Sequence, residues 1–434
     1  MWYDEALVYQ IYPLGFCGAP YENDGVPASR ILKITEWIPH MKELGVTCVL
    51  LNPVMESDRH GYDTRDYLTC DTRLGTNADL QEVCRQLHDA GMKTLFDGVF
   101  NHTGRGFWAF RDLQEHKWDS PYKDWYHVNF DGDTNYHDGF WYEPWEGHLE
   151  LAKLNLWNEA VIRHQFDAIR SWVDLYDIDG LRLDVAYCLP PEYLQKLRSF
   201  TNELKADFVL VGETLHGDYN RWMSDRMCHS VTNYECYKGL YSSFNSMNMF
   251  EIGYSLNRQF GSDPWCLYTG RNLLSFCDNH DVPRIATTLQ DPRQLKPLWS
   301  LVFTMPGVPA VYYGSEWGIT GDKGNMDQDL RPCLDKPEWN DLTDWIAALA
   351  RVRRENPALC YGDYHQVQCL NKGLVFSRSW GGHRIITAIN ASGEALDISA
   401  GGGQGRNLLT DQPADLDGQI RLEPWQTCIW LVQD

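Results

Sequence analysis

The chain has 434 residues, of which 43% are hydrophobic and 23% are charged, and these fractions are typical of a folded protein in water rather than a disordered or membrane-embedded one. This length exceeds one ordinary core and predicts a large domain with one or two smaller companions. The formal net charge of −22 at pH 7 would repel phosphate backbones and anionic lipids, so we expect neither nucleic acid nor a membrane as a partner.

The N-terminal segment 1–13 has no basic region followed by a long apolar run, so it predicts neither a secretory signal nor a membrane anchor. Thirteen cysteines are scattered along the chain without a CxxC pair or a zinc-type cluster. Unpaired thiols are the simplest interpretation, and a cytoplasmic location follows from both observations.

Strand-like and helix-like runs alternate from about residue 6 to about residue 359. In chain order, we predict a strand at 6–13, a helix at 31–45, a strand at 46–54, a helix at 77–91, a strand at 93–102, a helix at 158–176, a strand at 180–186, a helix at 191–205, strands at 207–214, 229–237, 272–281 and 308–318, and a helix at 340–356. Asn77 is the expected N-cap of its helix and Gly91 the residue that ends it. Eight strands with helices between them indicate an α/β fold, a (β/α)8 barrel.

The alternation is interrupted between residues 103 and 150, where the chain is rich in aromatic residues, glycine and aspartate. An insertion of this length is usually functional, and it predicts a small subdomain after the third strand. Beyond residue 359, short alternating runs separated by turns predict a C-terminal antiparallel β-sandwich. We therefore expect a barrel at 1–102 and 151–359, an inserted subdomain at 103–150 and a β domain at 360–434.

Polar side chains gather where the predicted barrel strands end, and in such a barrel these ends meet at one rim. The strand ends are HGYD (60–63), DGVFNH (97–102), RLD (182–184), GE (212–213) and DNHD (278–281). The rim should therefore hold three acids with histidine, arginine and tyrosine side chains around them: Asp184, Glu213, Asp281, His102, His280, Arg182 and Tyr62.

Two carboxyl groups facing each other are what glycosidic cleavage needs, because one attacks the anomeric carbon while the other protonates the departing oxygen. Arg182 shares a strand face with Asp184 and should lower the pKa of that carboxyl. Glu213 follows an apolar run without a neighbouring cation and should keep its proton as the acid. Taken singly, Arg182 and Asp184 fit a structural ion pair, and His280–Asp281 fits a helix cap. Their joint occurrence at successive strand ends favours an active site.

Four motifs resemble those of glycoside hydrolase family 13, the α-amylase family: DGVFNH (97–102), GLRLDVA (180–186), GET (212–214) and CDNHD (277–281). The resemblance implies that Asp184 is the nucleophile, Glu213 the general acid and base, and Asp281 a third carboxylate that grips sugar hydroxyls. It implies that Asp97 fixes Arg182. It also implies a set of substrate-binding residues: Tyr62, His102, Arg182, His280, His216, Asp327 and Arg331.

Within that family, HGYDTRDY (60–67), LAKLN (151–155) and PAVYYGSEWGITG (309–321) are most similar to cyclomaltodextrinases, neopullulanases and maltogenic amylases. The likeness implies that Asp327 and Arg331 form an outer sugar-binding pair. That group usually carries an N-terminal β domain that forms a dimer and covers the active site, whereas this sequence starts at the first barrel strand. The oligomeric state therefore stays open, with a monomer as one option.

Metal binding is a second point at which the sequence departs from the secreted α-amylases. Lys153 stands where many of them carry a calcium-binding aspartate, so we expect no calcium there, and Asn101 alone is a weak indication of that site. A structural calcium loop near Asn23 and Asp24 is left open. The chemistry itself needs no cofactor.

The sequence thus predicts a retaining α-glucan hydrolase that cleaves α-1,4-glucosidic bonds in cyclodextrins and maltodextrins by double displacement. Alternatives in the same fold are an intracellular α-amylase or neopullulanase acting on linear or branched glucans, and an α-glucanotransferase. A non-catalytic sugar-binding relative should lack one of the three acids, and all three are present.

Overall fold

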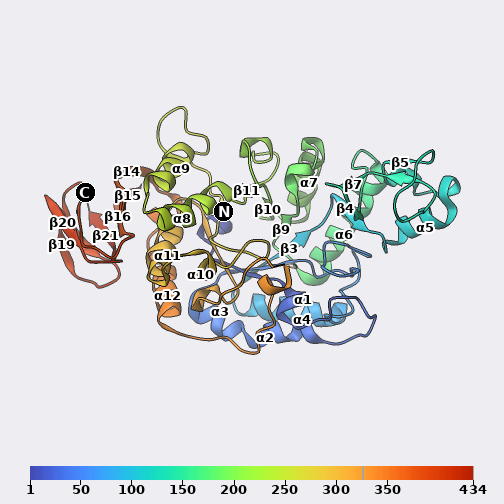
Figure 1. Ribbon diagram of the computed structural model, residues 1–434, viewed down its shortest axis with the longest axis horizontal. Coiled ribbons are helices and arrows are strands. Elements are labelled where there is room, and N and C mark those ends of the chain that lie inside the picture. The colour runs from blue at the N-terminus through green and yellow to red at the C-terminus, as the bar shows by residue number, and fades with distance from the viewer. Residues whose placement is uncertain (325–326, 434) are drawn as a thin grey trace.

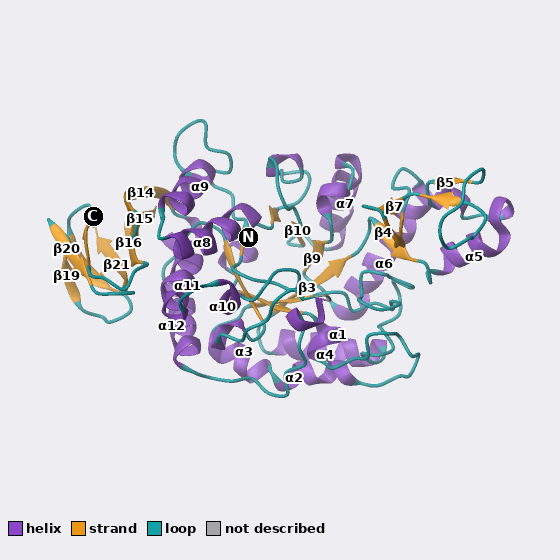
Figure 2. Cartoon of the chain, viewed as in Figure 1, coloured by secondary structure: helices purple, strands orange, loops and turns teal. Residues whose placement is uncertain are grey.

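The computed structural model describes residues 1–324 and 327–433, and its centre is a parallel sheet of eight strands (Figures 1 and 2). The strand order is β11-β10-β9-β3-β2-β1-β13-β12. Thr232, directly after β11, forms a parallel bridge to Leu274 of β12, which brings the two outer strands together. The predicted (β/α)8 barrel is therefore confirmed. Its strands are β1 (Val8–Ile11), β2 (Cys48–Leu51), β3 (Lys93–Gly98), β9 (Gly180–Leu183), β10 (Val209–Gly212), β11 (Ser230–Val231), β12 (Leu274–Ser275) and β13 (Val308–Tyr312).

Helices lie around the barrel (Figure 2). They are α1 (Pro13–Phe16), α2 (Lys33–Glu36), α3 (Ile38–Leu44), α4 (Asn77–Asp89), α6 (Glu159–Tyr176), α7 (Pro191–Leu204), α8 (Tyr234–Ser246), α9 (Phe250–Phe260), α10 (Ile285–Thr288), α11 (Leu295–Thr304), α12 (Asp341–Glu355) and α13 (Ala358–Tyr361). The outward strand residues Tyr9, Val49 and Phe96 belong to the core that these helices share. The inward residues Val8 and Leu50 belong to a separate core inside the barrel.

This alternation with a period of two determines which side chains reach the interior near the C-terminal strand ends. Val8, Leu50 and Leu95 fill the interior, and the next inward positions on the same strands are Gln10, Asn52 and Asp97. A polar layer therefore lies directly on the apolar one, at the end where barrels of this type place their sites.

Several local predictions were wrong in detail. The single helix predicted at 31–45 is divided at Trp37, because Pro39 has no N–H to donate to Thr35 and its ring crowds that carbonyl. The N-cap of α4 is Thr76 rather than Asn77, and it forms a capping box with Asp79.

The strands predicted at 229–237 and 272–281 contain only two strand residues each. Asn233 accepts a hydrogen bond from the Cys236 N–H (3.1 Å) and starts α8 there, so its local capping overrides the β-like pattern that follows. Gly91, with φ +84°, does follow α4 in the left-handed conformation, as predicted.

The inserted segment and the C-terminal domain lie at opposite ends of the barrel (Figure 1). In the insertion, β4 (His102–Gly104) pairs with β8 (His148–Lys153), and α5 (Trp108–His116), β5 (Val128–Asn129), β6 (Trp141–Tyr142) and β7 (Pro144–Trp145) lie between them. The small sheet thus runs past both predicted limits of the insertion, 103 and 150. The domain limits themselves stay a prediction.

The C-terminal domain consists of two antiparallel sheets with apolar residues of both in one cluster, including Val375, Trp430 and Ile398. One sheet is β14 (Asp363–Leu370), β15 (Gly373–Trp380), β16 (His383–Asn390), β21 (Thr427–Gln433), β18 (Gln404–Asn407) and β19 (Pro413–Asp415), and the other is β17 (Leu396–Ser399) and β20 (Gln419–Leu422).

All thirteen cysteines fall within the described ranges, and none forms a disulfide. Among the helices of residues 1–324 and 327–433, none has both the length and the apolar character that crossing a membrane requires.

Candidate active site

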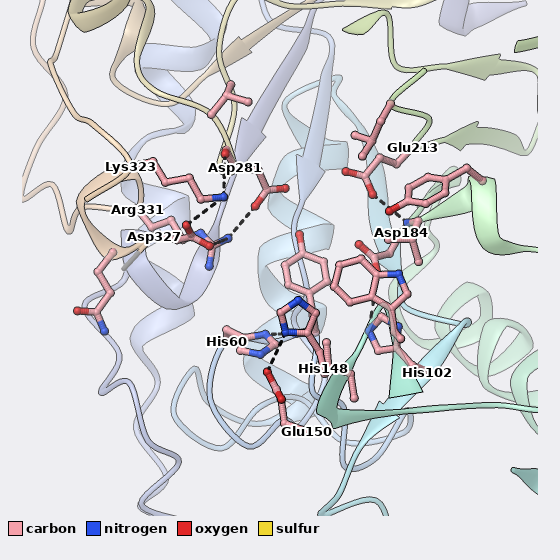
Figure 3. Close-up of a pocket in the computed structure, with 18 of the residues that line it drawn as sticks. His60, His102, His148, Glu150, Asp184, Glu213, Asp281, Lys323, Asp327 and Arg331 are labelled. Atoms are coloured by element: carbon pink, nitrogen blue, oxygen red, sulfur yellow. Dashed lines mark hydrogen bonds and ion pairs between the residues drawn. The ribbon is translucent and has the colours of Figure 1, made fainter. Parts of the chain in front are cut away.

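A cavity of about 630 Å³ opens at the C-terminal ends of the barrel strands (Figure 3). In Figure 3, Asp184 and Glu213 lie on one side of it, and Asp281 with Arg331 on the other. The inserted segment and the loop after β13 supply further walls. Residues from these two segments that line it are Trp145, His148, Glu150, Leu151, Lys323, Asp327, Gln328 and Arg331.

One buried arginine connects three carboxyl groups at the bottom of the cavity. Arg182 of β9 is 4% exposed, and its Nη1 donates to both oxygens of Asp97, each at 2.8 Å. The same nitrogen donates to Asp184 Oδ1 at 3.0 Å, and Nη2 lies 2.9 Å from Glu213 Oε1. The sequence prediction that Asp97 holds Arg182 agrees with this geometry, and Glu213 proves to be a further partner of the same cation.

The turn after β9 orients the two acids toward each other. Val185 has φ +40°, a left-handed conformation that is strained for a β-branched residue. Its N–H points at Glu213 and donates to Oε2 at 2.8 Å. Local strain of this kind is typical of functional sites, and here it places a backbone donor between the two carboxyl groups.

Burial dominates the protonation of both acids. It raises the pKa of Glu213, which agrees with the sequence prediction of a group that keeps its proton. Burial also raises the pKa of Asp184, and this outweighs the opposite effect of Arg182. The predicted lowering of the Asp184 pKa was therefore wrong, because a single arginine also has to compensate Asp97 and Glu213.

A buried carboxyl with a raised pKa stabilises the fold only while it is protonated, so its contribution is present below the unfolded-state pKa and lost as pH rises. We expect Asp184→Asn to raise the free energy of unfolding by about 1–2 kcal/mol at pH 7 and by almost nothing at pH 3.5. Thermal unfolding at both values measures this. Asp225→Asn, at a side chain that is 88% exposed, is the control. An equal gain for Asp184→Asn at both pH values would contradict the explanation.

The third acid, Asp281, is in the opposite state. Burial alone would raise its pKa, but the hydrogen bond from the His280 ring and the charge of the Arg331 guanidinium hold the pKa well below the ordinary value. His280 Nε2 lies 2.9 Å from Oδ2, and Arg331 Nη2 donates to Oδ1 at 2.8 Å. Asp281 is thus an ionised acceptor that faces the cavity.

The other predicted substrate-binding residues divide into two groups. Tyr62, His102, Asp327 and Arg331 line the cavity, and burial lowers the pKa of His102 to about 3, which makes its ring neutral. Arg182 and His280 are buried and are not among the lining residues. Arg331 contacts Asp281 as well as Asp327, so it stands nearer the acids than an outer pair implies. His216 is exposed and is not among the lining residues, whereas Leu215 before it is.

Sequence reasoning missed several residues of the site. Gln10 and Asn52 are buried next to His280 and Asp97, and their only signal was the inward position at the end of a strand. Tyr234 lines the cavity from the first turn of α8, which was predicted as strand. Trp145 also lines the cavity, but the sequence indicated it only as one of many aromatic residues in the insertion.

No group of three or more His, Cys, Asp or Glu side chains among residues 1–324 and 327–433 is arranged to hold a metal ion. Lys153 Nζ contacts Glu143 Oε1 at 2.5 Å, beside the expected position of the family calcium site. The side-chain oxygens of Asn23 and Asp24 accept hydrogen bonds from the N–H groups of Gly25 and Val26. Whether calcium binds near these two residues stays open, as in the sequence analysis.

Comparisons with known proteins agree with this geometry. Residues 10–345 match the family model described as alpha amylase, catalytic domain. A cyclomaltodextrinase from Thermoanaerobacter pseudethanolicus is 28% identical over 421 residues, which cover 90% of this chain and 71% of that protein. An intracellular maltogenic amylase from Bacillus subtilis is 25% identical over 425 residues, covering 92% and 70% respectively.

A solved structure extends the likeness to the whole chain. The cyclic alpha-maltosyl-(1→6)-maltose hydrolase from Arthrobacter globiformis, in complex with that sugar, is 26% identical with a TM-score of 0.84 and covers 99% of both chains. Because the matched model spans most of this chain and its barrel carries the acids of the family motifs at one rim, the chain belongs to the α-amylase family of glycoside hydrolases.

Proposed function

We propose that this protein is a retaining hydrolase that cleaves α-1,4-glucosidic bonds in cyclodextrins and maltodextrins by double displacement. The observation that carries the proposal is that Asp184 and Glu213 contact the two terminal nitrogens of one guanidinium, Arg182, at 3.0 and 2.9 Å. Carboxyl groups held in this way stand close together, and a short separation of about 5–5.5 Å distinguishes retaining from inverting glycosidases.

The roles follow from the surroundings of each acid. Asp184 attacks the anomeric carbon in its ionised form, which the Arg182 guanidinium favours. Glu213 gives its proton to the departing glycosidic oxygen, so the C–O bond breaks as an ester to Asp184 forms. Glu213 then takes a proton from water, and this water attacks the same carbon and releases Asp184. Asp281, ionised and facing the cavity, accepts hydrogen bonds from sugar hydroxyls. No cofactor takes part in these steps.

Small cyclic or short linear α-glucans are the substrate class we propose. The walls formed by the inserted segment and by the loop after β13 bound the cavity on two sides, which suits a compact substrate. A specific second candidate is a small ring with mixed linkages. It is favoured because the hydrolase of cyclic alpha-maltosyl-(1→6)-maltose covers 99% of this chain and is covered to 99% by it. A cytoplasmic location is proposed from the relative named an intracellular maltogenic amylase.

We expect rings to be opened faster than starch, with the α-anomer as the first product. The test compares rates on α-, β- and γ-cyclodextrin, cyclic α-maltosyl-(1→6)-maltose, maltoheptaose, pullulan and soluble starch, with products resolved by size and anomer. A β-anomer as first product would exclude retention. Starch preferred over every ring would make the protein an α-amylase of linear glucans, and products longer than maltoheptaose would make it a transferase.

A further inference from the structure

A chain of hydrogen bonds inside the barrel connects Arg182 with His280, and its direction can be followed from one end. Both oxygens of Asp97 receive a hydrogen bond from Arg182 Nη1, so Asp97 is an acceptor. Asn52 Nδ2 donates to Asp97 Oδ2 at 2.9 Å. A carboxylate offers no proton, so the amide of Asn52 must turn its nitrogen toward Asp97 and its oxygen away.

The orientation of Asn52 fixes that of the next residue. Gln10 Nε2 donates to Asn52 Oδ1 at 2.9 Å, and the same nitrogen lies 2.9 Å from His280 Nδ1. An amide nitrogen carries two hydrogens and accepts no hydrogen bond, so it donates to both neighbours. Nδ1 of His280 is therefore an acceptor, and the ring proton must be on Nε2.

We propose that Gln10 is a positioning residue that fixes the ring proton of His280 on Nε2 and so directs a hydrogen-bond donor at Asp281 and Tyr62, which line the cavity. In the structure, Nε2 lies 2.9 Å from Asp281 Oδ2 and 2.5 Å from the Tyr62 hydroxyl. That hydroxyl donates to Asp97 Oδ2 at 3.0 Å, which leaves it free to accept from His280. The two ends of the chain therefore require the same tautomer.

Two tyrosine rings stack on the His280 ring, so its hydrogen bonds are made at the ring edge, through Nδ1 and Nε2. The ring is 1% exposed and stacks on Tyr12 and on Tyr62, with interplanar angles of 12° and 14°. A doubly protonated ring would direct an N–H at the N–H of Gln10, which burial makes costly. The Nε2–H group meets Asp281 and the Tyr62 hydroxyl, so the position of its proton determines how these two cavity-lining groups are held for a substrate.

The tautomer can be measured by nuclear magnetic resonance on protein labelled with 15N-histidine, with the His280 signals identified by their loss in His280→Gln. At pH 7 the wild-type protein should show the proton of His280 on Nε2. In Gln10→Glu, the carboxylate accepts instead of donating, so the proton should appear on Nδ1. Gln10→Met removes the donor without offering an acceptor. Gln294→Met is the control, because Gln294 is also buried but donates to Phe244 O outside the site.

The kinetic consequence rests on the proposed function, whereas the tautomer does not. On the best substrate, Gln10→Glu should lower kcat/KM about 10- to 100-fold and Gln294→Met less than about threefold. A wild-type His280 protonated on Nδ1, or a Gln10→Glu protein that keeps Nε2–H, would overturn the inference. A wild-type protein with Nε2–H but no activity on any glucan would refute the proposed function and leave the role of Gln10 standing.

Discussion

Glu213→Gln is expected to lose about 10²–10⁴-fold in rate on maltodextrins and cyclodextrins while it keeps rapid reaction with α-maltosyl fluoride in the first turnover. A glucosidic oxygen needs a proton to leave, and the amide of glutamine supplies none. Fluoride leaves without protonation, so attack by Asp184 can proceed. The amide oxygen of glutamine can still accept from Arg182, which contacts Glu213 at 2.9 Å, so the site keeps this contact.

The second half of the reaction should fail in the same variant, because the glutamine amide cannot take a proton from water. A maltosyl ester on Asp184 is therefore expected to accumulate, and mass spectrometry of the peptide that contains Asp184 would detect it. Asp184→Asn should form no ester and be inactive on both substrates. Glu150→Gln is the control within the cavity, since that carboxyl pairs with His148 at 3.4 Å and no catalytic step uses it. Equal losses of Glu213→Gln on fluoride and glucan would remove the acid role.

Arg182, Asp184 and Glu213, which the sequence placed together, share one property: each lies in a barrel strand or directly after it. Arg182 follows Leu181, a residue of the outer core, so its inward direction could be predicted. The barrel position of Asp184 followed in the same way. Such residues also carry charge, and a charge at a buried position is itself a signal, because it is seldom kept there for stability alone.

What the sequence could not show is how many partners a charge has. Arg182 stands two residues from Asp184, which suggested a simple pair and a lowered pKa. The structure adds Asp97 and Glu213, which come from other strands, and burial then raises the pKa of Asp184. The sequence around Arg182 does not indicate how many carboxyl groups from other strands will contact it.

Neutral residues of the site were missed for a related reason. Gln10 and Asn52 carry no charge, and an amide at the end of a strand is equally common in a solvated loop. Their importance comes from hydrogen-bond direction, which depends on Asp97 and His280, residues distant in the sequence. In contrast, the sequence does contain a signal for the break before α3, because Pro39 lies inside the segment predicted as one helix.

Arg182→Met is expected to lower the free energy of unfolding by about 3–5 kcal/mol at pH 7, because it leaves three buried carboxyl groups without their shared cation. Arg182 lowers the pKa of both Asp184 and Glu213, so its removal should raise both pKa values further. Carboxyl groups with raised pKa stabilise the fold below their unfolded-state pKa and lose this contribution as pH rises. The loss should therefore be large at pH 7 and much smaller near pH 4, as measured by urea unfolding at each pH.

A matched control separates charge from packing. Arg353 on α12 is 2% exposed, but its guanidinium donates to the backbone carbonyls of Phe303, Leu359 and Gly307. Arg353→Met should also destabilise the protein, because it leaves buried carbonyls unpaired, but by an amount that hardly changes between pH 4 and pH 7. If Arg182→Met shows the same flat profile, Arg182 contributes through packing alone. If the free energy of unfolding recovers in acid for Arg182→Met but not for Arg353→Met, Arg182 acts as the counter-charge that offsets the repulsion between these buried carboxyl groups.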